Sequence, residues 1–277
     1  MDAKIDYLSF TCMTDVRHVE GQGEQRNAVM AALWGKHPVF MEWASTLSGW
    51  ENGGARAHYA LSEFNARTFC AVRFGGSANH ILVELPGTAC QSLRDADLLT
   101  ALITEVSERL TRLDVAVDIP HGCSPAEFVR AGYNERFKSH AELVSESGET
   151  EYVGSMKSER FARIYRYSAP HPRANTLRVE FVLRSDFAKA AAAHLLEASL
   201  VSLAALLGNT FGWVSEEWQP ETTTEGRLRA TRADRHEPGR VRWLYNVVIP
   251  AIIKASKEGL IDLPEFLGRI DAVYSVD

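Results

Sequence analysis

Three segments in the middle of the chain alternate apolar and polar residues along their length. They are RLDVAVDI at residues 112–119, RFARIYRY at 160–167 and TLRVEFVLR at 176–184. Because successive side chains of a β-strand point to opposite faces, this pattern predicts strands with one apolar and one polar face. The chain must therefore form a sheet whose apolar face packs on a core.

The rest of the chain supplies further strands and several helices. Strands are predicted at 4–13, twice within 56–75, at 79–87 and at 150–155. Helical spacing of apolar residues predicts helices at 24–34, 92–113, 124–132, 186–207 and 241–257. Ser124 and Glu127 form the capping-box pattern that begins a helix. We expect an α+β fold, with a mostly antiparallel sheet, helices packed on one face and a helical C-terminal portion.

The length of 277 residues is enough for a large core. We expect an α+β domain at 1–207 and a helical region at 208–277, with a polar linker near 219–239. The four cysteines form no CxxC pair, so neither a structural zinc nor a disulfide framework is indicated. With no signal-peptide pattern and no long uncharged apolar run, we expect a cytoplasmic protein.

Charge is unevenly distributed along the sequence. The net charge of -6 argues against a protein that coats nucleic acid by charge alone. Basic residues nevertheless concentrate in two stretches, 157–184 and 227–242. These stretches are either a local anion-binding surface or two solvated charge runs.

The polar faces of the three central strands bring together carboxylates, arginines and tyrosines. If the loop between the last two strands is centred between residues 172 and 173, Tyr165 pairs with Glu180 and Tyr167 with Arg178. Asp114 and Asp118 lie on the polar face of the segment 112–119. Glu84, in the strand at 79–87, extends the same face.

This set of side chains suits phosphodiester chemistry. Carboxylates such as Glu180 are the ligands that Mg²⁺ or Mn²⁺ prefers, and these ions stabilise charge in phosphoryl transfer. Arginine binds phosphate through two hydrogen bonds, and a tyrosine beside cations can act as a nucleophile. Asp114 and Asp118 are about 13 Å apart along an ideal strand, so we expect one to bind the metal and the other to position an arginine.

Several motifs, taken in order, resemble the replication initiation factor family, the tyrosine-dependent rolling-circle initiators of certain plasmids and filamentous phages. They are DYLSFT, ILVELPGTAC, TRLDVAVDI, YVGSMKSERFARIYRY, RVEFVLR and VRWLYNVVIPAIIKASKEG. The resemblance implies a palm-like domain related to relaxases, which nicks one strand of a replication origin in a metal-dependent reaction. The products are a 5'-phosphotyrosyl link and a free 3'-hydroxyl. The implied partners are origin DNA, as a single-stranded or cruciform nick site, a host helicase and polymerase, and a second copy of the chain.

The family's nucleophile lies in a pattern like Arg-Ile-Tyr, which corresponds here to Arg163, Ile164 and Tyr165. The family has a lysine where this chain has Tyr167, so Tyr167 is either a second nucleophile or a packing or base-stacking residue. We expect Arg163 and Arg178 to hold the scissile phosphate. The residues expected to contact DNA elsewhere are Lys157, Arg160, Arg166, Arg227, Arg229 and Arg232.

Two other functions fit the same residues. One is a non-catalytic DNA-binding regulator of a phage or mobile element, which would bind an origin or operator without nicking it. The other is a metal-dependent nuclease in which water attacks, so that cleavage would survive replacement of Tyr165 by Phe.

Overall fold

The structure is a computed structural model of the whole chain. It describes residues 2–13, 22–47, 58–64, 67–73, 80–120, 123–132, 140–145, 148–166, 176–212, 227–230, 249–259, 262 and 264. The chain forms two compact units, residues 1–230 and residues 231–277. The second unit contains helix α9 (Ile249–Lys257). No helix in the described ranges is long and apolar enough to span a membrane.

The first unit is built on one antiparallel sheet, which has nine strands among the described residues. Their order across the sheet is β2-β3-β4-β1-β5-β9-β8-β7-β6. The strands are β1 (Asp2–Met13), β2 (His58–Phe64), β3 (Arg67–Arg73), β4 (His80–Pro86), β5 (Leu110–Pro120), β6 (His140–Ser145), β7 (Gly148–Val153), β8 (Arg160–Arg166) and β9 (Thr176–Arg184). This confirms the predicted α+β class. Only β6 had not been predicted among these strands.

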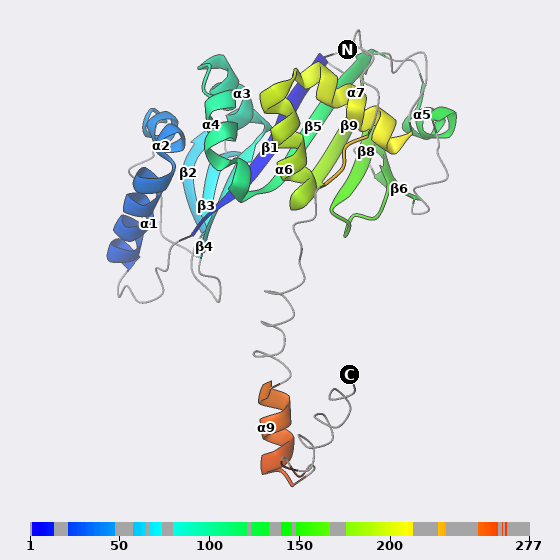
Figure 1. Ribbon diagram of the computed structural model, residues 1–277. Helices are drawn as coiled ribbons and strands as arrows, with labels where there is room; N and C mark the ends of the chain where they lie inside the picture. Colours follow the sequence, from blue (N-terminus) through cyan, green and yellow to red (C-terminus); the bar gives the residue numbers. More distant parts are fainter. Residues whose placement is uncertain are drawn as a thin grey trace. The chain divides into compact units, whose positions relative to one another are not determined.

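Helices cover one face of the sheet, as Figure 1 shows for α3, α4, α6 and α7. The α-helices that the structure describes in the first unit are α1 (Gln22–Lys36), α2 (Pro38–Ser45), α3 (Gly87–Asp95), α4 (Leu99–Val106), α5 (Pro125–Gly132), α6 (Asp186–Glu197) and α7 (Leu200–Phe211). Helix α5 begins with the predicted capping box. The backbone N–H of Ser124 donates to Glu127 at 2.7 Å, and that of Glu127 donates to the Ser124 hydroxyl at 3.2 Å.

Two predicted helices are each split in the structure. The helix predicted at 92–113 was wrong, because Asp97 has a φ of 59° and separates α3 from α4, and because Leu110 already belongs to β5. The helix predicted at 186–207 is divided into α6 and α7 by Ala198, whose backbone is extended. The Ser199 hydroxyl then caps α7 by accepting a hydrogen bond from the backbone N–H of Ser202.

The core lies between the apolar face of the sheet and these helices. Val115 and Val117 of β5 and Phe181 of β9 are completely buried. Helix α6 contacts both β5 and β9, and the ring of Phe181 lies 5.2 Å from that of Phe211 at the end of α7. The face predicted to be apolar is therefore the face that packs on the core.

The predicted pairing of β8 with β9 was wrong by two residues. Tyr165 pairs with Arg178, and Arg163 pairs with Glu180, because the connection between the strands is centred one residue earlier than assumed. A shift of two residues leaves every side chain on its original face. The composition of the polar face is thus as predicted, while the neighbours on it differ.

Candidate functional site

The candidate site is the face of the sheet opposite the helices, here called the polar face. Cross-strand pairing places charged and tyrosine side chains of five adjacent strands on this face. The residues are Glu84 from β4, Tyr7 from β1, Arg112, Asp114 and Asp118 from β5, Arg178 and Glu180 from β9, and Arg163 and Tyr165 from β8.

Tyr165 is partly exposed on the polar face and lies in the field of two arginines. It pairs directly with Arg178 on β9 and stands two residues from Arg163 on its own strand. Burial lowers the pKa of both guanidinium groups, but hydrogen bonds to Glu180 and Asp118 and the charges of nearby carboxylates raise it overall. Tyr165 therefore has a guanidinium-bearing residue as its neighbour on β9 and another on its own strand.

Arg163 holds Glu180 through a two-point contact. Its Nε and Nη2 atoms donate to the two carboxylate oxygens of Glu180. The Glu180 side chain is 0% exposed, whereas that of Arg163 is 35% exposed. Burial raises the pKa of Glu180, and the bonded guanidinium opposes that rise.

Arg112 holds Asp114 in the same manner. The Nε atom of Arg112 donates to Asp114 Oδ1 at 2.8 Å, and its Nη2 atom donates to Oδ2. The guanidinium carbon also lies 4.4 Å above the centre of the Tyr7 ring, a cation–π contact. The Tyr7 hydroxyl donates to Glu84 at 2.6 Å, and Glu84 in turn forms an ion pair with Arg73.

Arg178 links two carboxylates from different strands. It donates to both oxygens of Asp118 at 2.7 and 2.8 Å, and its Nη1 atom donates to Asp6 at 3.2 Å. Asp6 reaches it because the pairing of β1 with β5 shifts between Ile5 and Tyr7, which makes Asp6 the extra residue of a β-bulge. Arg178 is only 4% exposed, so it holds Asp118 and Asp6 in place beneath the surface of the polar face.

The predicted metal ligands do not fit a divalent cation as they are arranged. Glu180, Asp114, Asp118 and Glu84 are each bonded to an arginine. In the described part of the chain, no group of three or more His, Cys, Asp or Glu side chains is placed to hold a metal ion. The requirement for Mg²⁺ or Mn²⁺ stays a prediction from the sequence.

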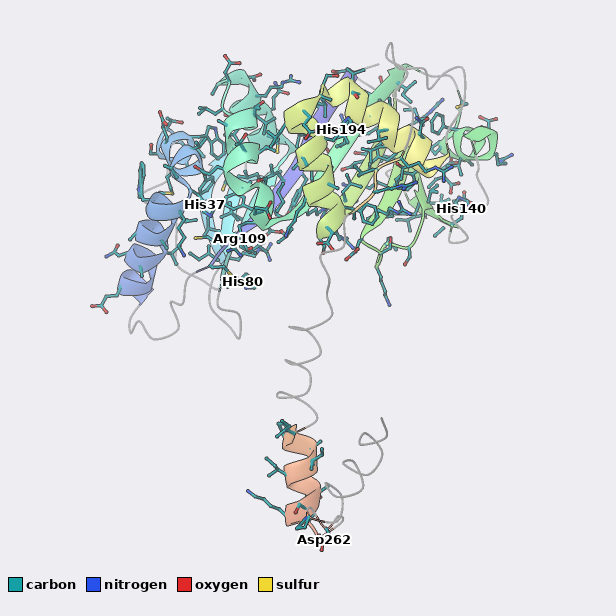
Figure 2. All side chains as sticks on the ribbon, in the orientation of Figure 1. His37, His80, Arg109, His140, His194 and Asp262 are labelled. Atoms are coloured by element: carbon teal, nitrogen blue, oxygen red, sulfur yellow. The ribbon has the colours of Figure 1, made fainter. Side chains whose placement is uncertain are left out.

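Histidines add no further ligand cluster among the described residues. Figure 2 labels His37, His80, His140 and His194, which lie at separate places on the first unit. His37 precedes α2, and the others lie on β4, β6 and α6.

The residues predicted to contact DNA elsewhere are dispersed. Lys157 is exposed in the turn between β7 and β8. Arg160 and Arg166 alternate with Arg163 and Tyr165 along β8, so they lie on the helix-covered face. There the Arg160 guanidinium lies 4.6 Å above the ring of Phe187, and Arg166 donates to the carbonyl of Cys123.

Four predicted residues remain: Tyr167, which follows β8 directly in the sequence, and Arg227, Arg229 and Arg232, which follow α7. Arg227 and Arg229 are exposed. Arg232 and Tyr167 lie outside the described residues. The predicted roles of these four residues stay predictions.

Three residues of the site were not assigned from the sequence: Asp6, Tyr7 and Arg112. Tyr7 and Arg112 occupy polar positions of alternating strands, so the alternation itself was a usable signal. Asp6 could not be placed this way, because a bulge breaks the alternation that assigns faces.

The same architecture occurs in a solved structure, that of Rolling Circle Replication Initiator Protein from Geobacillus stearothermophilus. The match has a TM-score of 0.51 and covers 83% of this chain and 91% of that chain, with 22% sequence identity. The chain has the fold of a rolling-circle replication initiator. At this level of identity, the likeness to the Geobacillus initiator concerns the fold alone. No family model and no curated protein matches the sequence.

Proposed function

We propose that the chain is a DNA strand-nicking protein of the rolling-circle initiator type, in which the Tyr165 hydroxyl attacks a phosphodiester. The observation that carries this proposal is the position of Tyr165, partly exposed on the polar face and in the field of Arg163 and Arg178. The fold shared with the Geobacillus initiator supports it.

Positive charge beside a phenol favours its ionised and nucleophilic form. Tyr165 has Arg178 at its cross-strand position and Arg163 two residues away on its own strand, an arrangement that would suit a nucleophile attacking a negatively charged diester. Arg163, whose side chain is partly exposed, would contact the phosphate, and the buried Arg178 would add a positive charge beside Tyr165.

The proposed reaction is one transesterification. The Tyr165 oxygen forms a bond to phosphorus, and the bond between phosphorus and the 3' oxygen breaks. The phenolic proton leaves to solvent, and the 3' oxygen takes up a proton. The products are a 5'-phosphotyrosyl link and a free 3'-hydroxyl, so no co-reactant is consumed. Asp114 and Glu180, two of the acids predicted to hold a divalent cation, are bonded to arginines, so a cation would have to displace a guanidinium group to reach them.

The remaining parts of the proposal concern partners. Origin DNA would contact the polar face, and Lys157, Arg227 and Arg229 are exposed cations that could bind it elsewhere. A host helicase, a polymerase and a second copy of the chain belong to the proposal as partners of an initiator.

The test is covalent capture. The protein is incubated with a supercoiled plasmid library that carries the DNA flanking its gene, with Mg²⁺ or Mn²⁺, and nicked circles with attached protein are collected. We expect capture by the wild type and by Tyr152→Phe, and none by Tyr165→Phe. Tyr152 is a matched control, because it lies on the same face, pairs with Arg163 and packs near Phe161.

Other results identify other functions. Capture that survives Tyr165→Phe would move the nucleophile to Tyr167. Cleavage that leaves no protein on the DNA would indicate attack by water. Binding without any nicking would favour the DNA-binding regulator, a candidate supported by the arginine-bonded state of all four predicted metal ligands.

A further inference from the structure

The polar face has two layers of charge at its centre. The side chains of Asp114 and Glu180 are 0% exposed. The arginines bonded to them lie above, because the side chain of Arg112 is 28% exposed and that of Arg163 is 35% exposed. A molecule that approaches this face therefore meets guanidinium groups before it meets carboxylates.

Both guanidinium groups are fixed in orientation, and in both the Nη1 atom takes no part in the bond to the carboxylate. Each uses Nε and Nη2 to bond its carboxylate, so Nη1 points away from the acid. Neither Nη1 atom donates to another residue in the described ranges. Arg112 is held further by the Tyr7 ring beneath it. A guanidinium fixed along one edge presents its other edge to a ligand, and this planar fork matches the oxygens of a phosphate.

The two cations also affect each other. Burial lowers the pKa of Arg112, and its bond to Asp114 raises it overall, while the charge of Arg163 opposes that rise. Two like charges held near one another repel, and a bound anion relieves the repulsion. Arg112 lies on β5 and Arg163 on β8, with β9 between them, and their backbones are level with Arg184 and Glu180 of β9. The acids that they bond are nearer to each other, because Asp114 is level with Val182, two residues from Glu180. An anion shared by both arginines would lie above β9, between these two acids.

We propose that Arg112 joins Arg163 at the scissile phosphate, so that the two arginines together bind this one backbone phosphate of a single DNA strand, on the β5 side of Tyr165. The identity of the ligand as DNA rests on the proposed function. The site holds the strand in position and carries no sequence information, because phosphate contacts are the same for every base.

The test measures binding of a fluorescently labelled oligothymidylate by anisotropy over a series of salt concentrations. Arg112→Gln is combined with Asp114→Asn, so that no unpaired charge is buried. We expect the affinity to be about tenfold lower. The slope of the logarithm of the binding constant against the logarithm of the salt concentration should be smaller by about 0.7, the value for one phosphate contact on a single strand. Arg94→Gln is the matched control, because Arg94 is an exposed arginine on α3, and it should change neither quantity.

A second pair tests whether the phosphate is shared. Arg163→Gln with Glu180→Gln should give the same loss of slope. The variant with all four substitutions should show the slope change of one phosphate contact and not of two, because both arginines bind the same phosphate.

The site is overturned if the folded Arg112 variant keeps the affinity and slope of the wild type, or if the wild type does not bind oligothymidylate. The binding series is repeated with an oligodeoxyadenylate of equal length, and a loss seen with only one of the two strands also overturns the site, since that would indicate base contacts. Wild type that binds but never nicks defeats the proposed reaction and leaves this site standing. If the wild type nicks DNA and the Arg112 variant binds normally, the proposed reaction stands and the phosphate site is overturned.

Discussion

Arg163 on β8 donates two hydrogen bonds to Glu180 on β9, and the Glu180 side chain has no exposure to solvent. The same arrangement recurs where Arg112 bonds Asp114 and where the buried Arg178 bonds Asp118. The centre of the polar face is therefore a row of buried acids whose charges are balanced by arginines from the same or the adjacent strand.

The first prediction concerns the stability of the buried pair. Arg163→Leu leaves the Glu180 carboxylate buried without its partner, which should cost about 3–5 kcal/mol of unfolding free energy. Arg163→Leu combined with Glu180→Leu should cost much less, because no lone charge remains. Urea unfolding of both variants measures the difference. Equal losses in the single and double variants would contradict it.

The second concerns divalent metal ions. Arg163 occupies both oxygens of Glu180, so Mn²⁺ could bind this acid only in competition with the guanidinium. We expect Arg163→Gln to bind Mn²⁺ about tenfold more tightly than the wild type, which is about 1.4 kcal/mol. Titration of free Mn²⁺ by its paramagnetic resonance signal measures this directly. The control is Arg163→Gln with Glu180→Gln, which should lose the gain. If the single variant binds no more tightly than wild type, Glu180 is not a metal ligand.

The third prediction concerns Gly87, which packs closely against the bulge residue Asp6. A Cβ added at Gly87 would lie 2.8 Å from Asp6 Oδ1 and 3.0 Å from the Asp6 carbonyl oxygen. Gly87→Ala should destabilise the protein by about 1–3 kcal/mol, the usual cost of overpacking, and should disturb the contact of Asp6 with Arg178.

Gly35→Ala is the matched control for this substitution, because an added Cβ there would meet nothing within 4 Å. In helix α1 it should stabilise the protein by about 0.5–1 kcal/mol. Thermal and urea unfolding distinguish the two glycines. An effect of the same sign at both positions would show that the crowding at Asp6 is not the cause.

The fourth concerns pH and His37. Burial lowers the pKa of His37 to about 4, helped by the charges of Lys36 and Arg109. This lowering prevails although Glu105 lies 3.7 Å from His37 Nδ1. The ordinary value is 6.5, so the unfolded chain takes up a proton at higher pH than the folded chain.

The contribution of His37 to stability is therefore complete above pH 6.5 and is lost as pH falls from 6.5 to about 4. The slope should reach at most about 1.4 kcal/mol per pH unit, the value for one proton. His37→Gln should flatten urea-unfolding stability over this window. A variant with the wild-type slope would show that other groups cause the pH dependence.

Some features of this protein follow from the sequence alone, because they depend on residues close together in the chain. The alternation in RLDVAVDI and TLRVEFVLR assigns Val115 and Phe181 to the core and Asp114 and Glu180 to the other face, whatever the pairing of the strands. The capping box of α5 joins residues three positions apart, and its prediction was confirmed for the same reason.

Other features were decided only by the tertiary structure. The pairing of Tyr165 with Arg178, the bulge that brings Asp6 to Arg178 and the break of the helix at Asp97 depend on how distant segments meet. The same holds for the balance between acids and arginines at the centre of the sheet. A strand's own sequence determines which side chains share a face, because that follows from its period of two residues. Which of them become neighbours depends on the offset between strands, and that offset is set by contacts across the whole sheet.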